Sequence, residues 1–204
     1  MNKVIVIGGG GHSKVVIDII KNNGYEASEI EILDDNLDIG SEILSCKVVG
    51  KVKDALKYNK DTKFVIAIGN NEVREKISKE YKLDYTTFIH PSAVIGEDVN
   101  IDKGSVIMGG SVINSGTKIG KHSIINTSST IDHDSNIGDF VHLSPGVHMG
   151  GTVNVGNRTW IGVATSVKNN ISIGKDIIIG VGSVVINNVK EKGIYVGNPL
   201  RKIK

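Results

Sequence analysis

The chain has 204 residues with a formal net charge of +2, and hydrophobic residues make up 39% of it. This length predicts one or two domains with a sizeable core, and the balanced charge excludes the basic footprint of a nucleic-acid-binding protein. Cys46 is the only cysteine, which excludes an internal disulfide and a cysteine-rich zinc site and favours a reducing compartment.

The first seven residues run directly into glycine and lack the longer apolar stretch and the cleavage site of a signal peptide. No segment approaches the roughly 20 apolar residues that span a bilayer. We therefore expect a cytoplasmic protein that does not insert into membranes.

A glycine turn follows the first predicted strand, Val4–Ile7, and leads into His12 and an amphipathic helix. Where a strand meets a helix N-terminus, backbone N–H groups and the helix dipole suit a phosphate. The apolar residues expected on the buried side of this helix are Val15, Val16, Ile19 and Ile20.

Two further strands are predicted, Glu31–Leu33 before Asp34 and Asp35, and Phe64–Ile68 before Gly69. A helix over 72–81 follows. The alternation predicts a small α/β unit with a parallel sheet over residues 1–88.

The ligand of this unit is open from its residues alone. Asp34 ends the second strand, where such folds bind a ribose hydroxyl. However, Gly8-x-Gly10-x-x-Ser13 lacks the third glycine of a dinucleotide motif, and the unit supplies only one mononucleotide half. A single nucleotide-sugar is therefore favoured over NAD, and a purely structural turn remains the alternative.

A six-residue repeat dominates the rest of the chain, because sixteen consecutive positions at this spacing are aliphatic. Such residues occupy about a quarter to a third of positions by composition, so chance does not explain the pattern. Each hexad predicts a short strand with its aliphatic residue inward and a turn containing a residue such as Gly96 or Gly120. The sixteen positions are Ile95, Ile101, Ile107, Ile113, Ile119, Ile125, Ile131, Ile137, Leu143, Met149, Val155, Ile161, Val167, Ile173, Ile179 and Val185.

Three hexads close one triangular coil of eighteen residues, and coils stack at about 4.8 Å. Residues 93–188 hold a little over five such coils within a second domain over 89–204. Stacking supplies the core, because no single coil can bury its own apolar side.

On these features the chain resembles the NeuD/PglD family of sugar O- and N-acetyltransferases over nearly its whole length. It is most similar to members that N-acetylate a UDP-linked 4-amino-4,6-dideoxy sugar on the route to bacillosamine. The resemblance implies a Rossmann-like α/β half-domain before a left-handed parallel β-helix, with acetyl-CoA as cosubstrate and no metal. It rests on the segments 8–13, 33–35, 67–71, 126–134, 137–146 and 193–199.

The resemblance also implies roles for individual residues. His133 matches the catalytic general base, and Asp134 lies where the most similar members have a glutamate that orients it. His142, Val163 and Val181 match positions that line acetyl-CoA. The positions that match the nucleotide-sugar pocket are Gly10, Gly11, His12, Asp34, Asp35 and Gly69.

Acetyl transfer needs a base for the amine proton and donors for the oxyanion, and histidine suits the first task with a pKa of about 6.5. Gly151 follows His133 by eighteen residues, or one coil, so we expect it to stack there and offer its N–H as the oxyanion donor. Val163 and Val181 are also one coil apart and could guide the pantetheine arm.

His142 follows His133 by only nine residues, half a coil, which predicts opposite sides of the solenoid within one chain. If both serve one reaction, they must come from different chains. We therefore expect a homotrimer with its active sites at subunit interfaces.

Other interpretations stay open for single residues. From spacing alone, His133 lies in a turn and could be a solvated residue, and His122 and His148 are expected at the surface.

A zinc site is a further interpretation, because trimeric hexapeptide carbonic anhydrases, by resemblance, have two more zinc histidines 17 and 22 positions after the first. No histidine of this chain has that partner set, so the metal interpretation fails. The basic end 201–204 could touch CoA phosphates or be a solvated tail.

The expected function is acetyl-CoA-dependent N-acetylation of the 4-amino group of a UDP-sugar. Within the enzyme class, the alternative is O-acetylation of sialic acid or another sugar hydroxyl. A non-catalytic nucleotide-sugar-binding scaffold is the alternative of another class, and the presence of His133 beside an acid and of His142 argues against it.

Overall fold

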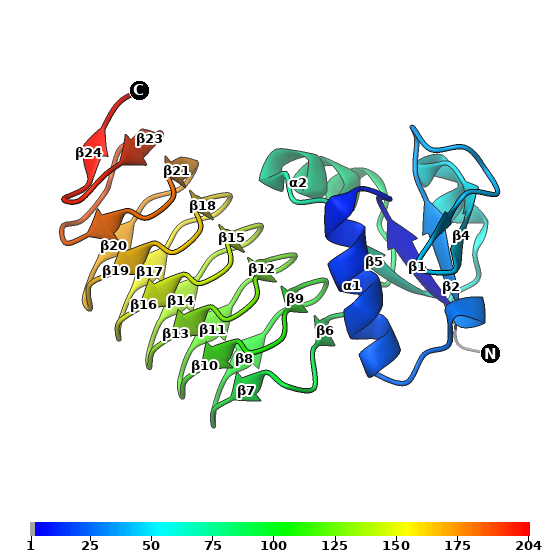
Figure 1. Cartoon of the computed structure of the whole chain (residues 1–204), viewed down its shortest axis with the longest axis horizontal. Coiled ribbons are helices and arrows are strands. Elements are labelled where there is room, and N and C mark those ends of the chain that lie inside the picture. The colour runs from blue at the N-terminus through cyan, green and yellow to red at the C-terminus, as the bar shows by residue number, and fades with distance from the viewer. Residues whose placement is uncertain (1–2) are drawn as a thin grey trace.

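The computed structural model describes residues 3–204 and consists of an α/β unit followed by a parallel β-solenoid, which confirms the predicted fold class (Figure 1). Within residues 3–204, no helix is both long and apolar enough to cross a membrane. The elements of the α/β unit are β1 (Val4–Ile7), α1 (Gly11–Asn22), η1 (Ala27–Glu29), β2 (Ile30–Leu33), β3 (Glu42–Ile43), β4 (Cys46–Gly50), η2 (Val52–Lys57), β5 (Lys63–Ile66) and α2 (Asn71–Glu80).

The sheet of the α/β unit has the order β3-β4-β2-β1-β5, and all its neighbours are parallel except β3 and β4. Helix α1 buries Val16, Ile17, Ile19 and Ile20. The prediction that Val15 lies on the buried side is wrong, since its side chain is 38% exposed. Ile17 takes its place, because the buried side of the helix is centred between Val16 and Ile20.

Each coil of the solenoid contributes one short strand to each of three parallel sheets, called here faces 1, 2 and 3. Face 1 contains β6 (Phe88–Ile89), β9 (Val106–Ile107), β12 (Ile124–Ile125), β15 (His142–Leu143), β18 (Trp160–Ile161), β21 (Ile177–Ile179), β23 (Gly193–Val196) and the antiparallel β24 (Arg201–Lys202). Face 2 contains β7 (Val94–Ile95), β10 (Val112–Ile113), β13 (Thr130–Ile131), β16 (His148–Met149), β19 (Ser166–Val167) and β22 (Val184–Val185). Face 3 contains β8 (Asn100–Ile101), β11 (Lys118–Ile119), β14 (Asn136–Ile137), β17 (Asn154–Val155) and β20 (Ser172–Ile173).

The predicted hexad register is confirmed, because Ile113, Ile131 and Met149 pair directly across β10, β13 and β16. Fourteen of the sixteen predicted inward residues, from Ile107 to Val185, are buried. Ile95 is 37% exposed, because β7 has a neighbour on one side only. The solenoid also begins one strand earlier than predicted, since β6 already pairs with β9.

Two positions in the turns of the solenoid place different demands on the residue. The left-handed residue lies three positions after the inward aliphatic and is often not glycine, as at Ser128 and Asp134. Gly120, directly after its aliphatic, is required for a different reason: a Cβ there would come within 2.5 Å of Asp139 Oδ1 in the next coil. Such glycines allow close stacking of the coils.

The α/β unit packs on the outer side of face 1, with α1 between the sheet and the first coils (Figure 1). Outward residues Phe88, Val106 and Ile124 join Val16 and Ile20 in one buried apolar cluster. Helix α2 extends this contact to later coils, since Asn71 and Arg74 donate to the carbonyls of Arg158 and Phe140.

Candidate active site

His133 lies in the turn after β13, with its side chain 58% exposed. Its Nδ1 is 2.8 Å from Asp134 Oδ2, and Asp132 Oδ1 accepts its backbone N–H. The Asp134 contact, followed by the charge of Asp132, raises the pKa of His133. Because the carboxylate faces Nδ1, the other ring nitrogen, Nε2, is left to take a proton from a substrate.

Asp134 makes this contact although its side chain is short. Its backbone is in the left-handed region, with φ of 57°, a conformation that aspartate tolerates better than most residues. Gly116 in the preceding coil leaves space for the Asp134 carboxylate, since a Cβ on Gly116 would lie 2.7 Å from Asp134 Oδ1.

Gly151 lies one coil from His133, as the eighteen-residue period predicts. A Cβ on Gly151 would lie 2.6 Å from His133 Nε2, so only glycine allows the imidazole this position. Thr152 N–H donates to the His133 carbonyl at 2.8 Å and fixes the two turns together. Among residues 3–204, the Gly151 N–H has no hydrogen-bond acceptor, and the residue is buried against the imidazole.

His142 lies on the outer side of face 1, only 8% exposed, where the α/β unit meets the solenoid. Its ring stacks on that of Trp160 at 5.8 Å and lies 6.1 Å from that of His12. Asn126 Nδ2 is 3.2 Å from its Nε2. Sequence reasoning gave Asn126 no site role and considered Trp160 only as a residue that caps or lines an interface, although Trp160 follows His142 by one eighteen-residue coil.

Both imidazoles of this pair are neutral at neutral pH. Burial, followed by the charge of Arg74, lowers the pKa of His142 to about 3 and that of His12 to about 4. Within the described chain, His142 Nδ1 and His12 Nε2 are buried without a hydrogen-bond partner. These two ring nitrogens are therefore the candidates in this region for a hydrogen bond to a polar ligand.

The glycine turn is open where a phosphate would bind. Gly10 is the N-cap of α1 without a side-chain cap, and a Cβ on Gly10 or Gly11 would meet nothing within 4 Å. Gly69, at the end of the strand beside β1, lies next to this turn, and a Cβ there would be 3.9 Å from the His142 ring.

The carboxylates after β2 are engaged within the chain. Asp34 Oδ2 accepts from Gly9 N–H at 2.7 Å, and Asp35 Oδ1 accepts from Val52 N–H at 3.0 Å. These bonds shape the loop beside the glycine turn. A ribose contact by either carboxylate stays a prediction.

The remaining predicted residues lie in the turns between faces 1 and 2. Val163 and Val181 are 45% and 73% exposed, and the Gly182 N–H donates to the Val163 carbonyl at 2.8 Å, so the predicted column is present. His133 follows face 2, whereas His142 lies outside face 1. One chain therefore presents two separate groups of candidate residues.

The prediction that His122 is a surface residue is wrong. Its side chain is 6% exposed, stacked on Phe140 at 5.2 Å and edge-on to Tyr85 at 4.6 Å. Tyr85 belongs to the segment that connects the α/β unit to the solenoid, so this burial depends on docking rather than on the repeat. His148 is exposed as predicted, and residues 3–204 hold no group of three or more His, Cys, Asp or Glu that could bind a metal.

Comparisons with known proteins cover both parts of the chain. The family model of the PglD N-terminal domain matches residues 3–81, and that of the bacterial transferase hexapeptide (six repeats) matches residues 92–127. A variant of perosamine N-acetyltransferase from Caulobacter crescentus, solved with CoA and GDP-perosamine, is 32% identical with a TM-score of 0.94, covering 100% of this chain and 98% of its own. This chain belongs to the PglD family of sugar acetyltransferases.

Other members of the PglD family show the same relationship. The acetyltransferase domain of PglB from Neisseria gonorrhoeae, solved with acetyl coenzyme A, is 29% identical with a TM-score of 0.95 and full coverage of both chains. UDP-N-acetylbacillosamine N-acetyltransferase of Bacillus subtilis is 36% identical over 113 residues, 53% of this chain and 52% of that protein. The match thus spans about half the length of this curated relative.

Proposed function

We propose that this protein is an acetyl-CoA-dependent N-acetyltransferase that acetylates the 4-amino group of a UDP-linked 4-amino-4,6-dideoxy sugar. The observation that carries the proposal is the group of His133, Asp134 and Gly151. It combines an oriented base with a free backbone N–H one coil away. The relatives of this protein are named for N-acetylation of nucleotide-linked or bacillosamine-type amino sugars, which supports this substrate class.

The proposed reaction begins when the sugar amine attacks the thioester carbonyl of acetyl-CoA. His133 Nε2 takes the proton that the amine loses as the C–N bond forms, and Asp134 stabilises the resulting imidazolium. The Gly151 N–H donates to the oxyanion of the tetrahedral intermediate. When the C–S bond breaks, the proton on His133 passes to the thiolate, which leaves CoA and the N-acetylated sugar.

The two groups of candidate residues suggest how the substrates reach this centre. The nucleotide phosphates would bind at Gly10 and Gly11, and the sugar would extend past His12 and Gly69 toward His142. The pantetheine arm of acetyl-CoA would lie along Val163 and Val181, and His142 would line the same cosubstrate. Since His133 and His142 lie on different faces of one chain, we propose a homotrimer. Each active site would combine His133 of one subunit with the group around His142 of its neighbour.

The test is a thiol-release assay with acetyl-CoA and a panel of UDP- and dTDP-amino sugars together with free sialic acid. We expect turnover of a nucleotide-linked amine, and loss of several orders of magnitude in rate for His133→Ala with binding of the sugar retained. Turnover of sialic acid alone would favour the O-acetyltransferase alternative. Binding of nucleotide sugars without turnover of any acceptor would reject catalysis and favour a scaffold.

A further inference from the structure

Arg74, the fourth residue of α2, is a buried arginine with no carboxylate partner among residues 3–204. Its side chain is 1% exposed, and burial lowers its pKa to about 9, which leaves the guanidinium protonated at neutral pH. Every nitrogen is nevertheless hydrogen-bonded, to neutral acceptors only. These are the carbonyls of Ile68, Gly69, His122, Phe140 and Val141 and the side-chain oxygen of Asn71.

The groups that accept hydrogen bonds from Arg74 lie on both sides of the region between the Gly69 loop and His142, where the sugar is proposed to extend and which is called here the acceptor site. Arg74 Nη1 donates to Ile68 at 2.8 Å and to Gly69 at 3.2 Å, in the loop beside the glycine turn. Nε donates to His122 at 2.7 Å, and Nη2 reaches the turn that leads directly into His142. One planar group therefore sets the separation between the Gly69 loop and the strand that carries His142.

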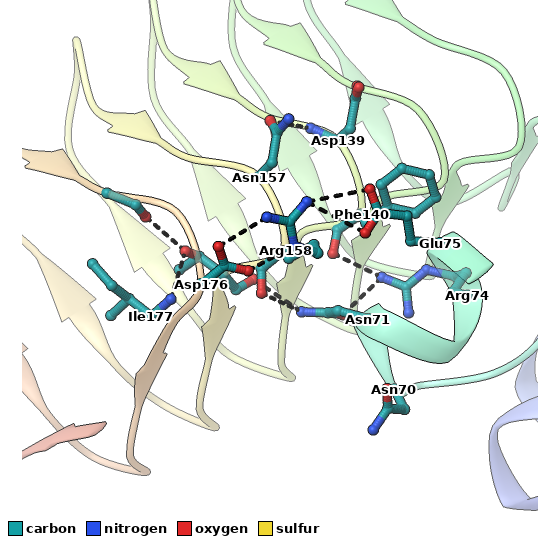
Figure 2. A network of polar contacts seen from close by, with 12 residues as sticks. Asn70, Asn71, Arg74, Glu75, Asp139, Phe140, Asn157, Arg158, Asp176 and Ile177 are labelled. Carbon is teal, nitrogen blue, oxygen red and sulfur yellow. Dashed lines mark hydrogen bonds and ion pairs between the residues drawn. The ribbon is translucent and has the colours of Figure 1, made fainter. Parts of the chain in front are cut away.

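A second set of contacts shows that the same helix is held on its outer side (Figure 2). Asn71 Nδ2 donates to the Arg158 carbonyl at 3.0 Å, and the Arg158 guanidinium bridges Glu75 and Asp176. These outer contacts already fasten α2 to the solenoid with partly exposed groups. Simple attachment therefore does not explain why a charge is also buried at Arg74, where an apolar residue would avoid the cost of desolvation.

The position of the charge supplies a reason. The titratable groups that face His142 are Arg74 from α2 and His12 from α1, and Arg74 also faces His12. A fixed positive charge beside two imidazoles opposes protonation of both. Their ring nitrogens then keep both a lone pair and an N–H for a polar ligand.

We propose that Arg74 is a positioning residue of the acceptor site, which holds the Gly69 loop against the His142 strand and presents a fixed charge to the His12–His142 pair. This inference rests on the proposed acetyltransferase function. Arg74 itself touches no reacting atom.

The kinetic test compares Arg74→Met and Arg74→Lys with the matched control Glu75→Gln, which weakens the outer attachment at the next residue of the same helix. We expect Arg74→Met to lower kcat/KM for the amino sugar about 100-fold, the scale of an approximately 1 Å misplacement. Arg74→Lys keeps the charge but reaches fewer carbonyls, so it should recover only part of the loss. Glu75→Gln should stay within about twofold of the wild type.

A second measurement does not depend on turnover, so it separates this inference from the proposed function. Amide hydrogen exchange of residues 68–71 should quicken in both Arg74 variants but not in Glu75→Gln. At pH 5, NMR should show His12 and His142 more protonated in Arg74→Met than in the wild type and in Arg74→Lys. If Arg74→Met matches Glu75→Gln in acceptor kinetics, loop exchange and histidine protonation, Arg74 has only a packing role and the inference is overturned. If Arg74→Met does not fold, the test uses Arg74→Lys instead. Faster exchange of residues 68–71 and a raised KM for the amino sugar in this variant support the inference, and wild-type values of both overturn it.

Discussion

The His133 imidazole lies against Gly151 of the next coil, so closely that a Cβ on Gly151 would be 2.6 Å from Nε2. The proposed base and the proposed oxyanion donor are thus one stacking distance apart. Their relationship is set by the solenoid itself, because residues eighteen apart occupy the same place in successive coils.

Gly151→Ala should therefore impair catalysis without impairing folding. The added methyl group would force the exposed imidazole to rotate, and a displaced base should lower kcat about 100-fold. The free energy of unfolding should change little, since the exposed ring can move into solvent. Steady-state kinetics and denaturant unfolding check both parts. As a control, Gly151→Ala/His133→Ala should be no slower than His133→Ala alone, and additive losses would contradict an effect through His133.

Asp134→Asn should shift the pH dependence of the reaction. The carboxylate raises the pKa of His133, and only the neutral imidazole acts as a base, so the wild-type rate rises with pH through this raised pKa. Without the charge, the pKa falls and the acid limb of kcat/KM moves to lower pH. The plateau should fall about 10- to 100-fold, because the imidazole loses its orienting partner. Asp132→Asn should cause a smaller shift in the same direction, and a profile that does not move in Asp134→Asn would remove Asp134 from this role.

Two inactive variants should restore activity when they share an assembly. If each site takes His133 from one chain and His142 from its neighbour, coexpressed His133→Ala and His142→Ala chains form some intact sites. Random mixing makes about a quarter of the sites intact, because each residue is present in half of the chains. Thiol release by the copurified mixture measures this. Activity no higher than that of either variant alone would contradict a site shared between subunits.

Acid should destabilise the junction between the α/β unit and the solenoid through His122. Burial lowers the pKa of His122 to about 4, below its unfolded value, so the unfolded state binds the proton first as pH falls. The stability that the neutral ring contributes is complete above pH 6.5 and is lost progressively below it. Between pH 7 and pH 5 this should amount to about 2 kcal/mol.

Urea unfolding at the two pH values tests this for wild type and for His122→Asn, which suits the left-handed backbone at φ of 52°. The variant should lose about 2 kcal/mol less than the wild type on acidification. The exposed His148→Asn serves as the control. An equal loss in wild type and His122→Asn would show that the junction does not respond to His122.

The repeat itself was sufficient to predict most of the solenoid. Residues that pair across coils, such as Ile131 and Met149, follow from the hexad spacing because parallel stacking preserves register. The same period predicted that Gly151 would lie against His133. It did not predict the exposure of Ile95, which follows from the absence of a neighbouring strand on one side.

Sequence alone therefore determined the two architectures, the inward residues and the stacking of Gly151 on His133, since these depend on local periodicity and on a constant coil length. Only the tertiary structure revealed the pairing of His12 with His142, the burial of His122 and the contacts of Arg74 across the junction. Those contacts join residues as far as 130 positions apart, from His12 to His142. They depend on how the α/β unit docks on face 1, and a docking orientation has no period that a sequence could display.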